Sequence, residues 1–281
     1  MKEILCIAKT ECVRWVRNSR IILFFMMLLF IQNLIVQPLL QCSTVMQEKL
    51  SCFESFLALG NSGTVVLIVP LFFLVMMSDY PERSSFDLFY QIRCSKRTWF
   101  WGQVLFGAAA ALGTVLLLLL GSVLLSLPRS TWMLHYSRAV TRYSVRFPER
   151  SGDYVLSLIP ANLYNQISLT KGLLHTSCLL FLYLFLLALI LLLSSICQRK
   201  TIGVAGDAVL ILIGTISCAI NASWRWIFPM AHTIVWYHWK EYLSEAVCSL
   251  EKSYLYFGGL CVALLLCGYH SITKYQIGIQ A

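Results

Sequence analysis

Long apolar runs without charged residues constrain this chain more than any other feature. No Asp, Glu, Lys or Arg occurs between Leu173 and Ile196, and several other stretches have the same character. A helix needs about 20 apolar residues to cross the ~30 Å hydrocarbon core of a bilayer. Hydrophobic residues make up 58% of the 281 and charged residues only 12%, and a soluble domain of this length could not bury so much apolar surface. The sequence therefore predicts an all-α, polytopic helical bundle in a membrane.

Six apolar runs, each bounded by charged or polar residues, predict six transmembrane helices. The second and the last runs are short, and we expect them to extend into neighbouring polar residues or to tilt within the bundle. No internal repeat or Gly/Ser-rich tether divides the chain, so residues 1–281 are expected to form a single transmembrane domain. The predicted spans are 21–40, 63–78, 104–127, 173–196, 202–220 and 254–269.

The distribution of Lys and Arg predicts the side of each connection. Basic residues gather before the first run and between the second and third runs, as expected for cytoplasmic segments. Both termini are therefore predicted to be cytoplasmic, in a multi-pass protein of the plasma membrane. The first run is too long for a signal-peptide core and lacks a cleavage site, so it is interpreted as a retained helix. The long connection 128–171 is basic but is predicted to lie outside, because long translocated loops follow the charge bias weakly.

The N-terminal stretch 1–20 alternates basic and apolar residues. Wound as a helix it is amphipathic, and Trp15 suits the headgroup level of a bilayer. We expect an amphipathic helix that lies on the inner membrane surface and leads into the first span.

The connection 79–103 holds the strongest candidate for a functional element. Ser84 followed by Asp87 is a typical start of a helix, with a capping hydroxyl and an acid in the first turn. Three aromatic residues then fall on one helical face, which suits docking into a groove of a soluble partner. On physical grounds alone, an interfacial loop anchored by aromatic residues explains the same pattern. The candidate partner-docking residues are Ser84, Phe86, Asp87, Phe89, Tyr90 and Arg93.

This connection resembles the first cytoplasmic loop of ABC-2 type transporter permeases. Two departures are Ser95, where that family commonly has Pro, and Gln103, where it commonly has Lys. The layout of the whole chain is also similar to that family, as is the segment from Phe228 to His232. The elements that carry the resemblance in the loop are Glu82-Arg83, the short helix at 86–92, Cys94-Ser95, Lys96-Arg97 and Trp101-Gly102.

The resemblance implies a permease subunit of an ATP-driven exporter that works by alternating access. The loop helix would then be a coupling helix, meeting a separate ATP-binding subunit, and a second permease subunit would complete a homo- or heterodimer. The sequence contains no G-x-x-x-x-G-K-[ST] string to hold nucleotide phosphates. We therefore expect that the chain is not an enzyme and binds no cofactor, that ATP and Mg²⁺ belong to the partner, and that nucleic acid is not a ligand.

Two other functions remain open from the residues. A non-catalytic membrane scaffold or sensor subunit would show the same spans and loops. An intramembrane serine protease would need a base near Ser62, which lies in the string Gly60-Asn61-Ser62-Gly63. On the predicted topology, His270 lies at the opposite side of the membrane from Ser62, which argues against that reaction.

Asp207 is the only acidic residue within a predicted span. A carboxylate inside a membrane is costly, which makes this residue a candidate for the pathway or for helix packing. Gly203 and Gly206 on the same run would allow close approach of a neighbouring helix.

Cysteine and histidine residues give weaker signals. No Cys-x-x-Cys pair occurs among the 11 cysteines, so no zinc site is predicted. Cys42 and Cys52 share one outer loop, and whether they pair is open. His232 and His238 flank Trp236 and Tyr237, which suits an aromatic belt better than a metal site.

Overall fold

The computed structural model describes residues 1–63, 65–81, 94–150, 152–240 and 245–273. Short 3-10 turns join the helices at η1 (Ser19–Ile21), η3 (Leu127–Arg129), η4 (Pro148–Arg150), η5 (Ser223–Ile227) and η6 (Val235–His238), with one π-helical turn at η2 (Gln32–Val36). In chain order the α-helices are α1 (Lys2–Arg17), α2 (Ile22–Ile31), α3 (Gln37–Met46), α4 (Glu54–Asn61), α5 (Ile68–Met77), α7 (Lys96–Ser126), α8 (Arg138–Thr141), α9 (Tyr143–Arg146), α10 (Tyr154–Leu158), α11 (Ala161–Gln166), α12 (Leu169–Ile196), α13 (Lys200–Ala219), α14 (Pro229–Thr233) and α15 (Leu250–Ser271).

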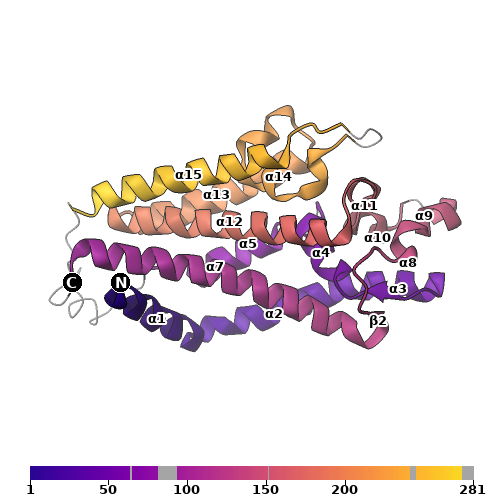
Figure 1. The fold of residues 1–281 in the computed structure, drawn as a ribbon, viewed down its shortest axis with the longest axis horizontal. Helices are drawn as coiled ribbons and strands as arrows, with labels where there is room; N and C mark the ends of the chain where they lie inside the picture. The colour runs from indigo at the N-terminus through magenta and orange to yellow at the C-terminus, as the bar shows by residue number, and fades with distance from the viewer. Residues whose placement is uncertain (64, 82–93, 151, 241–244, 274–281) are drawn as a thin grey trace.

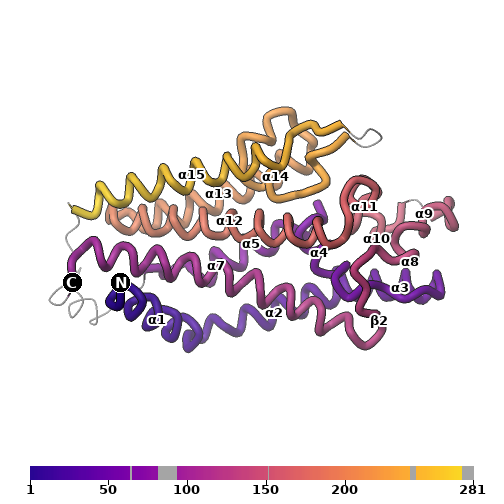
Figure 2. Tube along the Cα trace, viewed as in Figure 1, coloured from indigo at the N-terminus to yellow at the C-terminus, as the bar shows by residue number. Residues whose placement is uncertain are grey.

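These helices form an elongated bundle (Figure 1). The start of α1, the start of α7 and the last turn of α15 lie at one end, which we call the proximal end (Figure 2). The short helices α8 to α11 lie at the other end, the distal end. There the two-residue strands β1 (Leu50–Ser51) and β2 (Ser130–Thr131) pair in parallel.

Five helices among the described residues are long and apolar enough to cross a membrane. They contain four of the six predicted spans in full and a fifth, 202–220, up to Ala219, so the prediction of a multi-pass, all-α membrane bundle is confirmed. The last span, predicted as a short run, is part of a helix of 22 residues. The sidedness of the termini and the number six stay predictions. The five helices are Ser19–Met46, Lys96–Arg129, Leu169–Ile196, Lys200–Ala219 and Leu250–Ser271.

The second predicted span, 63–78, is not one long helix. Only α5 lies within it. The short helix α4, which was not predicted, ends before it, and the break between the two begins where Ser62 adopts an extended backbone conformation. Asn61 holds this break in place: its side-chain amide donates to Thr176 Oγ1 at 2.8 Å, and its side-chain carbonyl accepts from the Val235 amide at 2.8 Å. Trp236 Nε1 donates to the Asn61 backbone carbonyl at 2.7 Å. These partners supply hydrogen bonds that an interrupted helix would otherwise lose.

Helix α12 runs through the centre of the bundle. It packs against α7, α13, α15, α4 and α5, and its side chains from Tyr183 to Leu192 are largely buried. A helix that is apolar on every face lies in a protein core or spans a membrane, and α12 is the most buried of the five candidate spans among the described residues.

Helix α1 is the helix predicted for 1–20, and it packs along α7. Ile7 lies directly against Gly102, where a Cβ atom would come within 2.7 Å of Ile7 Cγ2. Ile7, Ala8 and Glu11 form the buried face, while Leu5 and Val16 are exposed. The helix therefore packs on the bundle through one face and leaves apolar side chains exposed on another.

Candidate functional site

All six candidate docking residues, Ser84, Phe86, Asp87, Phe89, Tyr90 and Arg93, lie outside the described residues. The structure does describe the two attachment points of that segment. On one side the chain leaves α5 through Ser78, Asp79 and Tyr80. On the other side, Ser95 caps α7 by accepting a hydrogen bond from the Thr98 amide at 3.2 Å.

Asp79 links three elements at the first attachment point. Arg20, just before α2, places Nη2 at 2.5 Å from Asp79 Oδ2, and its Nη1 donates to Ser78 Oγ at 2.6 Å. Lys200, the first residue of α13, places Nζ at 3.9 Å from Asp79 Oδ1. All three charged side chains keep contact with solvent. A movement of Asp79 would therefore change its contacts with Arg20, just before α2, and with Lys200, at the start of α13.

Tyr80 connects the same attachment point to α7 and α1. Its side chain is buried, and its hydroxyl donates to the Gln103 backbone carbonyl at 2.8 Å. Burial raises the pKa of Tyr80 well above its usual value, with a smaller contribution from Glu11, so the phenol stays protonated as a donor. The Gln103 side chain in turn donates to Glu11 Oε1 at 3.4 Å.

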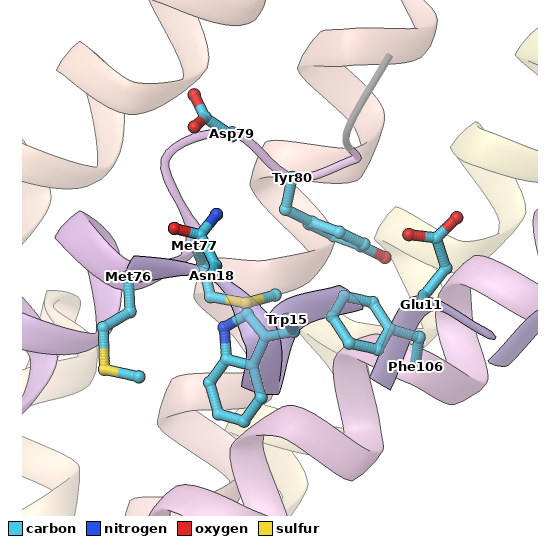
Figure 3. A pocket seen from close by; sticks show the side chains of 8 residues that line it. All are labelled: Glu11, Trp15, Asn18, Met76, Met77, Asp79, Tyr80 and Phe106. Carbon is cyan, nitrogen blue, oxygen red and sulfur yellow. The ribbon is translucent and has the colours of Figure 1, made fainter. Parts of the chain in front are cut away.

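The contacts of Asp79 with Arg20 and Lys200, and of Tyr80 with Gln103, are together called the proximal joint. A small cavity lies beside this joint (Figure 3). The ring of Tyr80 extends across it toward Glu11, with Phe106 and Trp15 close by. Its volume of about 30 Å³ is enough for one water molecule and too small for a transported solute. The cavity is therefore part of the joint. It is lined by Glu11, Trp15, Asn18, Met76, Met77, Asp79, Tyr80 and Phe106.

Asp207 lies on α13 and is completely buried. Neither of its carboxylate oxygens has a hydrogen-bond partner among the described residues, and the same holds for the hydroxyl of Tyr183 on α12. A buried polar group without a partner is costly and calls for an explanation. The unpaired carboxylate makes this site a candidate for contact with a solute, a proton or a second subunit.

The two predicted packing glycines differ in their surroundings. A Cβ atom at Gly203 would overlap the Ser194 side chain of α12, so α12 and α13 meet closely there. At Gly206, a Cβ atom would meet no described heavy atom within 4 Å. Of the pair, only Gly203 makes a close contact within the described part of the chain.

Glu54 is a site residue that sequence reasoning missed. It begins α4 at the distal end and is fully buried. Its carboxylate accepts hydrogen bonds from the Ser137 amide at 2.6 Å, the Ser137 hydroxyl at 3.0 Å and the Ser51 amide at 3.1 Å. Burial raises the pKa of Glu54 to about 7, although the donors from Ser137 and Ser51 act in the opposite direction. The only signal in the sequence was an acid just before an apolar run.

The long connection 128–171 is held against the bundle by this carboxylate and by β2. Within it, Pro160 lies between α10 and α11. Cys42 and Cys52 both carry free thiols, so they do not pair. No group of three or more metal-binding side chains occurs in the described part of the chain.

Comparison of the chain with protein-family models, with curated proteins and with solved structures found no match in any of the three.

Proposed function

We propose that this chain is the permease subunit of an ATP-driven exporter of the plasma membrane. It pairs with a second permease subunit and with a separate ATP-binding subunit, and it moves its substrate by alternating access. In this proposal the termini and the segment 82–93 are cytoplasmic, and that segment is the coupling helix.

The proposal is carried by the way in which segment 82–93 is attached. Through Asp79, its first attachment point contacts Arg20 and Lys200, and through Tyr80 it contacts Gln103. Its second attachment point, Ser95, is the cap of α7 itself. A push on this segment therefore acts on α2, α7 and α13 together, which is what a coupling element has to do.

The exposed ion pairs suit such a joint. Solvent-exposed pairs contribute only about 0–1 kcal/mol each, so they can break and re-form at little cost during a cycle. The buried Tyr80 supplies the firmer connection, because its hydroxyl is bonded to the backbone of α7. Asp207 and Gly203 lie on α13, whose first residue contacts this joint, and we place the pathway along this helix.

The first experiment asks whether an ATP-binding subunit is present. The tagged full-length chain is purified from its native membrane, and the co-purifying proteins are identified and assayed for ATPase activity in nanodiscs. Replacement of Phe86, Phe89 and Tyr90 by Ala is expected to reduce retention of the ATP-binding subunit by at least about tenfold, as for the anchors of an interface. Trp132→Ala is the matched control, since Trp132 is an exposed aromatic residue at the distal end. If the triple variant keeps its partner and its coupled ATPase activity, segment 82–93 is not the coupling helix.

A further inference from the structure

Ser253 places its hydroxyl between two buried histidine rings. Its Oγ atom lies 2.8 Å from His232 Nδ1 and 2.8 Å from His238 Nε2. His232 lies on α14, His238 ends η6, and Ser253 lies in the first turn of α15. The three side chains are almost completely buried, so the cluster has no access for a substrate. Figure 1 shows α14 beside the beginning of α15.

The other nitrogen of each ring faces a backbone carbonyl. His232 Nε2 lies 2.8 Å from the Trp226 oxygen, and His238 Nδ1 lies 3.0 Å from the Val235 oxygen. A carbonyl oxygen can only accept, so each of these nitrogens must carry hydrogen. The two remaining nitrogens then face the single hydroxyl of Ser253.

A count of hydrogens shows that the neutral cluster is one short. Each of the four ring nitrogens needs one hydrogen in its contact. Two nitrogens face the Ser253 hydroxyl and two face backbone carbonyls, where His238 Nδ1 shares its hydrogen between the Val235 oxygen and the Ile234 oxygen at 3.2 Å. Two neutral imidazoles supply two, and the hydroxyl supplies one. Either tautomer of either ring leaves one nitrogen lone pair against an oxygen lone pair. One added proton satisfies all four contacts, because one ring then donates to Ser253 while the hydroxyl donates to the other ring.

We propose that His232, Ser253 and His238 form a binding site for a single proton, which the two rings share through the Ser253 hydroxyl. A second proton is not accommodated, since it would place two positive rings on one hydroxyl in a buried site. The bound proton fastens the segment 229–238 to α15. This site does not depend on the proposed transport function.

One aromatic contact favours a positive charge on the cluster, and no bonded carboxylate is present among the described residues to balance a second one. The ring of Tyr256 stacks on His232 at 4.2 Å between centroids, a geometry that favours a cation over an aromatic face. The titratable groups beside the rings include Tyr256 of α15, which stacks on His232, and His175 of α12, which bonds Tyr254 at 2.9 Å. Arg225 of η5 lies over the Trp226 ring at 5.5 Å. No described Asp or Glu bonds either ring, so no carboxylate neutralises the proton.

Burial opposes the uptake of the proton. It lowers the pKa of His232 and lowers that of His238 to about 4. The missing hydrogen acts in the other direction, because the neutral form leaves a buried contact unmade. The shared step is therefore expected between pH 4 and the ordinary value for histidine of about 6.5.

The test is a titration of the full-length chain in phosphatidylcholine nanodiscs with ¹⁵N-labelled histidine. Signals are assigned with His232→Gln and His238→Gln. We expect both rings to shift with one common midpoint and a total uptake of one proton. Ser253→Ala leaves each neutral ring fully bonded to its carbonyl, so the midpoint should fall by at least about one pH unit. Ser122→Ala is the control, because Ser122 is equally buried and, among the described residues, its hydroxyl bonds only within α7.

Three results would overturn the proposal. One is a pair of separate midpoints with uptake of two protons, and another is no titration of either ring above pH 4. The third is an unchanged midpoint in Ser253→Ala. If that variant fails to fold, the common midpoint and the uptake of one proton in the unmodified chain still decide the question.

Discussion

The proximal and the distal end of the bundle are each held together by polar contacts, and these contacts are of different kinds. At the proximal end, Arg20, Asp79 and Lys200 meet in ion pairs that keep contact with solvent. At the distal end, Glu54 is fully buried and accepts three hydrogen bonds from Ser51 and Ser137. An exposed pair contributes little and is screened by salt, whereas a buried and fully bonded carboxylate is costly to disturb. The distal carboxylate therefore holds its end of the bundle firmly, whereas the proximal ion pairs can break at little cost, as the coupling movement that we propose requires.

The largest expected effect comes from removing the distal carboxylate. Glu54→Ala leaves two backbone amides and one hydroxyl buried without an acceptor, and the free energy of unfolding should fall by about 3–5 kcal/mol. Thermal unfolding of the purified chain in detergent measures this. Glu149→Ala, at an exposed acid of the same connection, is the control and should change stability by less than about 0.5 kcal/mol. Equal effects of the two substitutions would remove the contrast between a bonded and a solvated acid.

The pH dependence of stability should also come from the distal end. The folded pKa of Glu54 is about 7, above the ordinary value of 4.5, so the folded state holds a proton that the unfolded state has lost. Protonated Glu54 therefore makes its full contribution to the free energy of unfolding, up to about 3 kcal/mol, below about pH 4.5. This contribution is lost as the pH rises to about 7. Glu54→Gln should remove that dependence.

The measurement compares the unfolding temperatures of the unmodified chain and Glu54→Gln from pH 4 to pH 8. The difference between them should change across the window from pH 4.5 to pH 7 and stay constant above it. A constant difference over the whole range would show that Glu54 titrates normally in the folded chain.

The sequence predicted the long helices because their signal is local. Residues 173–196 have no charge and few polar groups, and α12 follows from that run alone. The short helix α4 and the non-helical start of the span 63–78 were not predicted, because their cause lies far along the chain: Asn61 is held by Thr176, Val235 and Trp236. No window around 63–78 contains these partners.

Single polar residues show the same limit. Asp207 stood out in the sequence because it interrupts an apolar run, and its burial fits that signal. Glu54 did not stand out, because its donors come from Ser51 and from Ser137 in a distant connection. His232 and His238 were interpreted as part of an aromatic belt, because the Ser253 hydroxyl that joins the two rings belongs to a different helix.

A smaller effect is expected where α1 sits on α7. At Gly102 an added methyl group would come within 2.7 Å of Ile7 Cγ2, so Gly102→Ala should push α1 outward at a cost of about 1–3 kcal/mol. Gly113→Ala on the same helix is the control, because no described atom lies within 4 Å of its added methyl group. Limited proteolysis of α1 should be faster in Gly102→Ala and unchanged in Gly113→Ala. Equal proteolysis in the two variants would show that the contact with Ile7 does not hold α1.

The smallest effect on stability is expected at the proximal joint. Asp79→Asn removes the charge that pairs with Arg20 and Lys200, and the free energy of unfolding should change by less than about 1 kcal/mol because these groups are solvated. In 1 M salt, where charges are screened over about 3 Å, the difference from the unmodified chain should almost vanish. Denaturant unfolding at low and high salt measures both values, and the effect of Glu54→Ala should persist at high salt. A loss of several kcal/mol in Asp79→Asn at 1 M salt would mean that the proximal joint is as rigid as the distal one, and the proposed coupling movement would then lack its hinge.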